Sequence, residues 1–420
     1  MAEQLHKRFE NNQLKSLLES YIRKEIEIGY ILSILKIGRS RFFEILKEYK
    51  QNRYDFSVEY QRNKSNNKIT SEVEESIMAE LEVEKSLIKD PEVSVKDYNY
   101  SYIRYRLLTE YKHKVSVTTI IDRAKKHGYY NKTKIKKVHD REVLTNHAGE
   151  LLQHDSSHHK WSPYADSKWY LITTLDDYSR KILYGDFFQS ETSWAHIEVA
   201  EYICLKYGIP LSFYVDCHSI FRFVQGRDSF YRNHIKTTDD VNPQFKQVLS
   251  DLGIKLIYAL SPQAKGKIER PYRWLQDRIV RTCARNGIKE IEDAREVLLS
   301  EIKRYNSAQV HSTTGEIPDI RFYRALDDKR SLFREFVIPA PYISTKDIFA
   351  LRDSRVVNAY RKISLKKIEL AVPNVPLRER VSLRIVPDMV TGIAEIRFWH
   401  NRKLAGTASA KNEDLNIQNF

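Results

Sequence analysis

The chain has 420 residues, which is long enough for several domains with separate cores. Lys and Arg exceed Asp and Glu by 14, and the excess lies on the flanks: 29 basic against 22 acidic residues in 1–147, 14 against 8 in 340–420, and 27 against 26 between them. Basic flanks can neutralise phosphates and so favour a nucleic-acid partner, although a merely soluble basic surface has the same composition.

The cysteines and the hydropathy pattern indicate where such a protein works. Cys204, Cys217 and Cys283 have neither metal-binding nor disulfide spacing, which suits a reducing compartment. The sequence has no run of about 18 apolar residues, and residues 1–21 are too polar for a signal peptide. We therefore expect a soluble, cytoplasmic protein.

Residues 1–66 are predicted to form a helix-turn-helix DNA-binding domain. Two short helices, Ile28–Leu35 and Arg39–Tyr49, flank the turn Lys36–Gly38. The recognition helix would open with three candidate DNA-binding residues: Arg39, Ser40 and Arg41. The turn is imperfect, because Lys36 stands where a positive φ favours glycine, so a purely structural helical hairpin remains open.

Residues 67–137 are predicted to form a second helical, helix-turn-helix DNA-binding domain. Helices are expected at Ser71–Asp90 and Tyr98–Tyr111, and Ser116 could cap a third that ends before Gly128. A basic linker, 138–147, follows. The candidate DNA contacts here are Arg123, Lys125, Lys126, Lys134, Lys136 and Lys137. A charge run is often only a solvated face, but residues 100–147 hold 12 basic and 4 acidic side chains next to the central region.

Three carboxylates mark residues 148–330. Asp155 follows an apolar stretch and is expected at a strand end, and Asp216 closes the strand predicted after a crossover helix and the Gly208–Pro210 turn. Glu269 falls in the first turn of a predicted helix, from which it could reach the two strand acids. A further helix, Glu290–Asn306, would brace the sheet.

These motifs carry a family resemblance. The segment Gly266–Arg270, with Trp274-Leu275-Gln276 downstream, resembles the helix signature of bacterial insertion-sequence DDE transposases of the integrase-core, retroviral-integrase-like family. The resemblance covers about residues 149–323. It implies an α/β ribonuclease-H-like core with a mixed five-stranded sheet, in which Asp155, Asp216 and Glu269 are catalytic and bind two Mg²⁺ or Mn²⁺ ions.

The resemblance also implies partners. They are double-stranded DNA, as transposon ends and as target, and further copies of the chain in a homodimer or higher multimer on the nucleoid. An insertion-like stretch, Phe221–Asn242, separates Asp216 from Glu269 and makes the third acid the least certain on spacing alone.

The chemistry explains these residue types. Two metals about 3.5 to 4 Å apart can activate the attacking oxygen and stabilise the leaving one, and Mg²⁺ and Mn²⁺ prefer oxygen ligands. Lys265, Lys267 and Arg273 border the third acid, where cations could hold DNA phosphates. Any single acid could equally be a solvated surface charge, so the prediction depends on all three contexts together.

Other sites and functions are alternatives to the predicted two-metal transposase. His154, Asp155, His158 and His159 could together be zinc ligands, but no cysteine partner is near, and His158 and His159 are expected in a loop. His154 would orient metal-bound groups or face solvent, and Cys217 is more simply a small buried side chain than a nucleophile. A non-catalytic DNA-binding regulator derived from a transposase, and a ribonuclease acting on hybrids, both remain open.

Residues 340–411 are predicted to form a small β-barrel domain. Short alternating apolar segments are separated by Pro, Asn and Gly, and the basic excess lies near the start of the domain. Such a domain could hold DNA or could be a plain packing domain. Residues 412–420 are expected to be a frayed tail.

Overall fold

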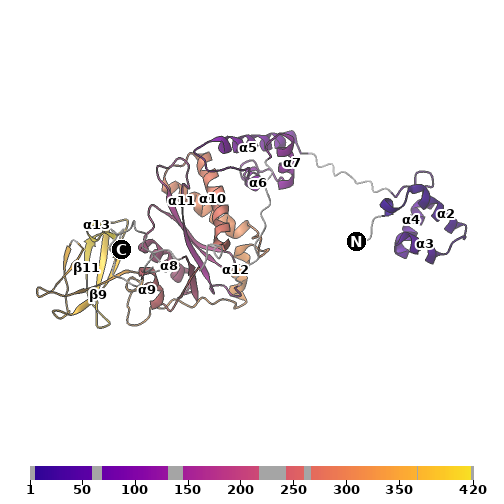
Figure 1. Cartoon of the computed structure of the whole chain (residues 1–420). Coiled ribbons are helices and arrows are strands. Elements are labelled where there is room, and N and C mark those ends of the chain that lie inside the picture. Colours follow the sequence, from indigo (N-terminus) through magenta and orange to yellow (C-terminus); the bar gives the residue numbers. More distant parts are fainter. Residues whose placement is uncertain are drawn as a thin grey trace, which may run out of the picture. The chain divides into compact units, whose positions relative to one another are not determined.

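The computed structural model describes residues 5–58, 69–130, 145–216, 243–259 and 266–417, apart from 367. The chain divides into two compact units, Met1–Glu74 and Glu75–Phe420 (Figure 1). No helix among the described residues has the length and apolar character needed to cross a membrane.

The first unit is a small helical bundle. Its helices are α1 (Leu5–Arg8), α2 (Asn11–Ile22), α3 (Ile28–Leu35) and α4 (Arg39–Gln51). They bury a shared apolar core from which solvent is fully excluded at Leu14, Leu18, Ile31, Leu35 and Phe42. The turn between α3 and α4 has the left-handed geometry expected there, because Lys36 adopts φ 49° in place of a glycine. The helices on both sides of this turn are therefore confirmed.

The next three helices belong to the second unit. They are α5 (Ser71–Lys89), α6 (Tyr100–Thr109) and α7 (Val117–Lys126). Ser116 caps α7 as predicted, since its side chain accepts a hydrogen bond from the backbone N–H of Thr119. Asn99 caps α6 in the same way. The all-α character of the N-terminal region is therefore confirmed.

A mixed five-stranded sheet forms the centre of the second unit. Its strands are β1 (Leu152–His159), β2 (Trp169–Asp176), β3 (Ile182–Phe188), β4 (Ser212–Val215) and β5 (Lys255–Tyr258), in the order β3-β2-β1-β4-β5. The first three strands are antiparallel, whereas β4 pairs in parallel with both β1 and β5. The mixed five-stranded sheet is thus as expected.

Helices cover both faces of this sheet (Figure 1). One face packs against α8 (Ser193–Tyr207) and α9 (Gln244–Asp251), and the other against α10 (Gly266–Asn286) and α11 (Ile291–Ala308). The alternation of strand side chains produces this division: Ile172 of β2 lies in the first core, and Leu171 lies in the second. Another helix, α12 (Pro318–Asp327), follows α11.

The C-terminal region is built from strands, but no closed barrel forms among the described residues. Four strands make an open antiparallel sheet in the order β11-β10-β9-β6, and β7 and β8 form a separate hairpin. The bounds are β6 (Leu351–Val356), β7 (Lys362–Leu365), β8 (Ile368–Ala371), β9 (Arg380–Pro387), β10 (Ile393–His400) and β11 (Lys403–Lys411). The barrel is not confirmed, because apolar alternation predicts strands without fixing which strands pair.

The end of the chain is not the frayed tail that was expected. A short helix, α13 (Asn412–Leu415), follows β11, and Leu415 and Ile417 are buried in the same apolar core as the C-terminal sheet. Burial of these two apolar side chains stabilises the packing of this otherwise polar segment against the C-terminal sheet. A 3-10 turn, η2 (Thr345–Asp347), precedes β6.

Candidate metal and nucleic-acid site

Asp155 lies in the middle of a strand rather than at its end. It is the fourth residue of β1, and its backbone is paired with that of Thr173 in β2. The prediction of a strand end was wrong because pairing with β2 continues as far as His159, opposite Trp169, through residues that are polar in sequence. Asp155 is intermediate in burial, so its side chain is not sealed in the core.

Asp216 directly follows β4, as predicted, and the register of the sheet aligns it with Asp155. In the parallel pairing of β1 with β4, Leu152 lies opposite Phe213 and Gln153 opposite Tyr214, an offset of 61 residues. The same offset separates Asp155 from Asp216. Because neighbouring strands lie about 4.8 Å apart, continuing this register places the two acids side by side. Asp216 is also intermediate in burial.

Helix α10 is attached to β1 at Asp155. The hydroxyl of Tyr272 in α10 donates a hydrogen bond to the backbone carbonyl of Asp155 at 2.6 Å, and it accepts one from Oγ1 of Thr173 at 2.9 Å. Tyr272 is buried. Burial, followed by the charge of Asp155, raises its pKa well above the ordinary value, so the hydroxyl keeps its proton for the carbonyl.

Position 269 lies one turn before Tyr272 in α10. Residues three apart share a helix face, with Cβ atoms about 5 to 6 Å apart, so this position is on the face that meets β1. The prediction that Glu269 falls in the first turn of a helix is confirmed by the start of α10 at Gly266. The side chains of Glu269 and Lys267, and the whole of Lys265, lie outside the described residues, while Arg273 is exposed.

Tyr272 is the residue that sequence reasoning missed. Its spacing in the sequence could have identified it, because it stands three positions after Glu269 and three before Leu275, on one face of an amphipathic helix. An aromatic residue in that pattern is usually core packing, and only the partner of its hydroxyl gives it a second role.

His154 neither faces solvent nor points toward the site of Asp155. It is 1% exposed, and its side chain alternates to the α8 and α9 face of the sheet. Its Nδ1 lies 2.9 Å from Oγ1 of Thr174, and its Nε2 lies 2.8 Å from Nδ1 of His196. Nε2 of His196 lies 3.1 Å from Glu191. This buried polar chain makes His154 part of the packing behind the sheet.

The zinc alternative has no structural support. His158 and His159 belong to β1 and not to a loop, because the strand continues to His159. The ring of His158 stacks on Tyr170, and Nε2 of His159 lies 2.9 Å from the Gln276 amide nitrogen. Within the described part of the chain no three His, Cys, Asp or Glu side chains are grouped to hold a metal ion. The side chain of Glu269 lies outside the described residues.

The cysteines that the structure describes are inert. Cys204 and Cys283 are free and fully buried. Burial raises the pKa of each thiol to about 12, so neither forms a thiolate near neutral pH. Cys217 and the stretch Phe221–Asn242 lie outside the described residues.

The described candidate DNA contacts of the helical units are exposed, except Arg123. Arg39, Ser40 and Arg41 open α4 on the surface, and Arg41 forms an exposed ion pair of 2.8 Å with Glu44. Lys125 and Lys126 are exposed in the last turn of α7, and Arg123 in the same turn is partly buried. Lys134, Lys136 and Lys137 lie outside the described residues.

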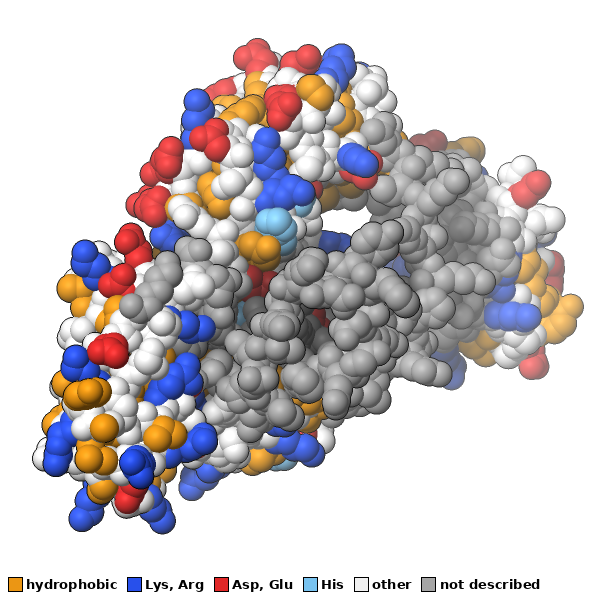
Figure 2. All heavy atoms as spheres, turned by 60° about the vertical axis from the view of Figure 1, so that its left-hand side comes forward, with side chains coloured by type: hydrophobic (Ala, Val, Ile, Leu, Met, Phe, Trp, Pro, Cys, Tyr) orange, Lys and Arg blue, Asp and Glu red, His pale blue; other side chains and the backbone are white. Residues whose placement is uncertain are grey.

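Basic side chains do not form one continuous patch on the face shown in Figure 2. Blue Lys and Arg groups are interspersed with acidic and apolar ones over the C-terminal sheet, which comes forward in this view. On this face, the described basic side chains of the C-terminal sheet therefore do not define a DNA path.

Two curated proteins of similar sequence are transposases. The transposase for insertion sequence IS1202 of Streptococcus pneumoniae is 36% identical over 171 residues, which cover 41% of this chain and 35% of that protein. The protein y4bF of Sinorhizobium fredii, provisionally named a transposase, is 34% identical over 158 residues, covering 38% of this chain and 33% of that protein. The resemblance to insertion-sequence transposases is confirmed, over about a third of the length of each relative.

Solved structures of viral integrases are more distant. The HTLV-2 integrase catalytic core domain in complex with magnesium matches 44% of this chain and 99% of its own, with 18% identity and a TM-score of 0.29. The simian T-cell lymphotropic virus intasome in complex with the PP2A regulatory subunit B56 gamma matches 74% and 95%, with 14% identity and a TM-score of 0.31. These TM-scores are too low to carry an argument. No protein-family model matches the chain.

Proposed function

We propose that this protein is a DNA transposase in which Asp155, Asp216 and Glu269 hold two Mg²⁺ or Mn²⁺ ions. The observation that carries the proposal is the 61-residue register offset between β1 and β4, because extending this register by two residues would align the two strand acids. The hydrogen bond from Tyr272 to Asp155 supports the third position, since it fixes one turn of α10 beside the same strand. The similarity to two transposases over part of the chain supports the reaction class.

The residues fit divalent metals. Carboxylate oxygens are the ligands that Mg²⁺ and Mn²⁺ prefer, and carboxylates on adjacent strands, whose backbones lie about 4.8 Å apart, could share ions. Asp155 and Asp216 are intermediate in burial, so neither residue is sealed in the core. When bound, the ions would activate an attacking oxygen and stabilise the leaving 3′ oxygen. Arg273, exposed one turn after position 269, would hold a neighbouring phosphate, as would Lys265 and Lys267.

The proposed reaction has two steps at one site. The protein would bind transposon terminal repeats with its helical units, hydrolyse one strand to free a 3′ hydroxyl, and join that hydroxyl to target DNA. Water and then the 3′ hydroxyl are the nucleophiles, so no covalent enzyme intermediate forms. Pairing of two ends calls for a homodimer or higher multimer on DNA, in the bacterial cytoplasm at the nucleoid.

Cleavage and joining of the element's terminal DNA test this function. With Mg²⁺ or Mn²⁺, we expect 3′ nicking and strand joining that EDTA abolishes. Asp155→Asn, Asp216→Asn and Glu269→Gln should each reduce cleavage at least about a hundredfold, because metal-bound charge stabilisation contributes several kcal/mol to the transition state, while DNA affinity is retained. Asp166→Asn, at an exposed aspartate outside the site, is the matched control.

The second candidate is a DNA-binding regulator without catalysis. Tight binding of terminal DNA with no metal-dependent nicking by the wild type would favour it. Cleavage of an RNA–DNA hybrid in preference to duplex DNA would instead favour a ribonuclease.

A further inference from the structure

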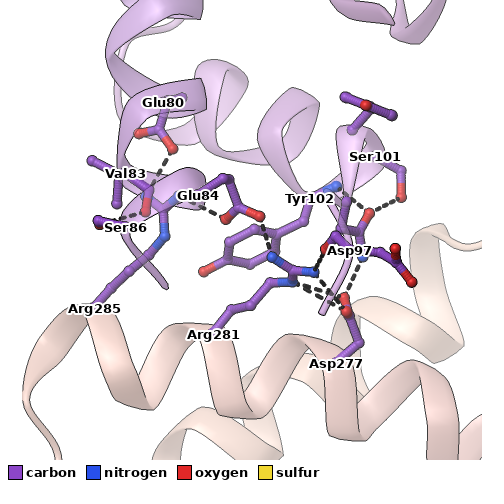
Figure 3. A network of polar contacts seen from close by, with 12 residues as sticks. Glu80, Val83, Glu84, Ser86, Asp97, Ser101, Tyr102, Asp277, Arg281 and Arg285 are labelled. Atoms are coloured by element: carbon purple, nitrogen blue, oxygen red, sulfur yellow. Dashed lines mark hydrogen bonds and ion pairs between the residues drawn. The ribbon is translucent and has the colours of Figure 1, made fainter. Parts of the chain in front are cut away.

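Helix α10 is held at its far end by a buried contact with α5 (Figure 3). Arg285 donates hydrogen bonds to Glu80 at 2.8 Å and to Glu84 at 2.9 Å, and Arg281 also donates to Glu84. Glu80 and Glu84 are 2% and 0% exposed. These four side chains are called the α5–α10 contact below. Glu80 also pairs with Arg106, and Arg281 also pairs with Asp277.

The segment that leads into α6 joins the same contact. Arg281 donates to the backbone carbonyl of Asp97 at 2.5 Å, and the Asn99 amide donates to Asp277, one turn before Arg281 in α10. The hydroxyl of Tyr102 lies 2.9 Å from that of Thr282. In Figure 3, Arg281 extends from α10 between α5 and this segment.

Apolar side chains seal the contact. Leu87, Val93 and Val95 share a buried core with Val280 and Ala284 of α10. A buried ion pair tolerates few alternative geometries, because moving either partner leaves an uncompensated charge in the interior. The contact therefore has one favoured arrangement and resists sliding of α10 along α5.

Helix α7, with its exposed lysines, is attached to this assembly. The hydroxyl of Tyr129, just after α7, donates to Glu82 of α5 at 2.6 Å, and the hydroxyl of Tyr100 in α6 donates to the carbonyl of Tyr129 at 2.9 Å. Lys125 lies 5.1 Å from the ring centre of Tyr130. The basic turn of α7 is thus connected to α5, and α5 to α10, by described side chains.

Helix α10 connects the α5–α10 contact to strand β1. Tyr272 binds β1 at Asp155, and Arg281 follows nine residues later, which is about 13 Å along the helix axis. All of these elements belong to the compact unit Glu75–Phe420. A displacement of α5 would therefore move α10, and with it the backbone of position 269.

We propose that the α5–α10 contact holds the basic turn of α7 at a fixed distance from Asp155, Asp216 and Glu269, so that DNA is cut a set number of base pairs from the phosphates that α7 binds. This inference rests on the proposed function. Glu84 and Arg285 are then positioning residues, which act through α10 and touch neither metal nor DNA.

The phosphates bound by α7 are found first. Hydroxyl-radical footprints of terminal DNA are compared between the wild type and the double variant Lys125→Ala, Lys126→Ala. We expect a few phosphates to lose protection in the variant while the rest of the footprint persists. If no phosphate loses protection, α7 does not contact DNA and the proposal is overturned.

The distance is then tested with the full chain and altered DNA. Between those phosphates and the scissile bond, one to five base pairs are inserted. We expect the cut to move by the inserted length, or cleavage at the original bond to fall at least tenfold. Cleavage at the original bond within twofold of the normal rate would overturn the proposal. Absence of metal-dependent cutting on unaltered DNA would instead contradict the proposed function. Failure of the proposed function and failure of this inference therefore give different results.

A variant of the contact separates positioning from mere stability. Glu84→Gln should spread the cuts over neighbouring bonds, while Glu75→Gln, at an exposed position of α5, leaves the single cut unchanged. A purely structural role would give fewer active molecules that still cut at one bond, and that result would overturn the assignment of Glu84. If Glu84→Gln does not fold, Arg285→Lys keeps the charge but loses the two-pronged geometry, and the same spread is expected.

Discussion

Replacing Tyr272 with phenylalanine should loosen the attachment of α10 to β1, the strand that carries Asp155. The change removes the Tyr272 hydroxyl, which donates a hydrogen bond to the Asp155 carbonyl at 2.6 Å and accepts one from the Thr173 hydroxyl at 2.9 Å. Thr173 is buried and Asp155 is partly buried, and a buried polar group without its partner costs about 1–3 kcal/mol. We expect the free energy of unfolding to fall by about that amount and metal-dependent cleavage to slow.

The chain offers a matched control for this change. Tyr305 is also buried, and among the described residues its hydroxyl has no hydrogen-bond partner, so Tyr305→Phe should alter stability by less than about 0.5 kcal/mol. Denaturant unfolding followed by tryptophan fluorescence is a suitable assay, because all five tryptophans lie after residue 74 and report only the second unit. Equal stability of the two variants would refute the role given to the Tyr272 hydroxyl.

Three further predictions concern pH, backbone geometry and DNA binding. Burial raises the pKa of Glu198 from 4.5 to about 7, so between these pH values the folded protein keeps a proton that the unfolded chain has lost. The free energy of unfolding therefore falls as the pH rises through this range. Glu198→Gln should leave stability at pH 4.5 unchanged and raise it at pH 8 by up to about 3 kcal/mol, as measured by denaturant unfolding. Gly208 has φ 102°, and an added Cβ would lie 2.5 Å from the Arg334 carbonyl oxygen, so Gly208→Ala should cost about 2 kcal/mol or more; a melting temperature equal to that of the wild type would contradict this. Removing Lys125 and Lys126 together should lower the slope of log K against log salt by about 2, and an unchanged slope would exclude both as phosphate contacts.

Local signals in the sequence predicted local structure well. The Ser116 cap, the turn at Lys36 and the placement of Asp216 directly after a strand each depend on a few neighbouring residues. The strand that carries Asp155 was placed too short, because its second half is polar and is specified by pairing with β2. The predicted barrel is not confirmed for a similar reason, because strand pairing depends on the whole fold and not on neighbouring residues in the chain.

Buried charge was the feature least visible in the sequence. The acidic segment that forms α5 was correctly predicted to be helical, but such a composition usually indicates a solvated face. Glu80 and Glu84 are buried because Arg285, about 200 residues away, lies against them. Nothing near α5 in the sequence identifies that partner, and without it these glutamates would be expected at the surface.

The position of the third acid does not depend on the length of chain that precedes it. Spacing made Glu269 the least certain of the three, because Phe221–Asn242 lengthens the connection from Asp216. The helix that carries it is fixed by contacts made after it in sequence: Tyr272 binds β1, and Arg281 and Arg285 bind α5. A connection of any length that lets α10 begin near β1 satisfies these contacts, because lengthening a flexible loop costs little free energy. Variation in this connection is therefore expected to be tolerated, whereas a one-residue insertion between Glu269 and Tyr272 would rotate position 269 by about 100° relative to Tyr272.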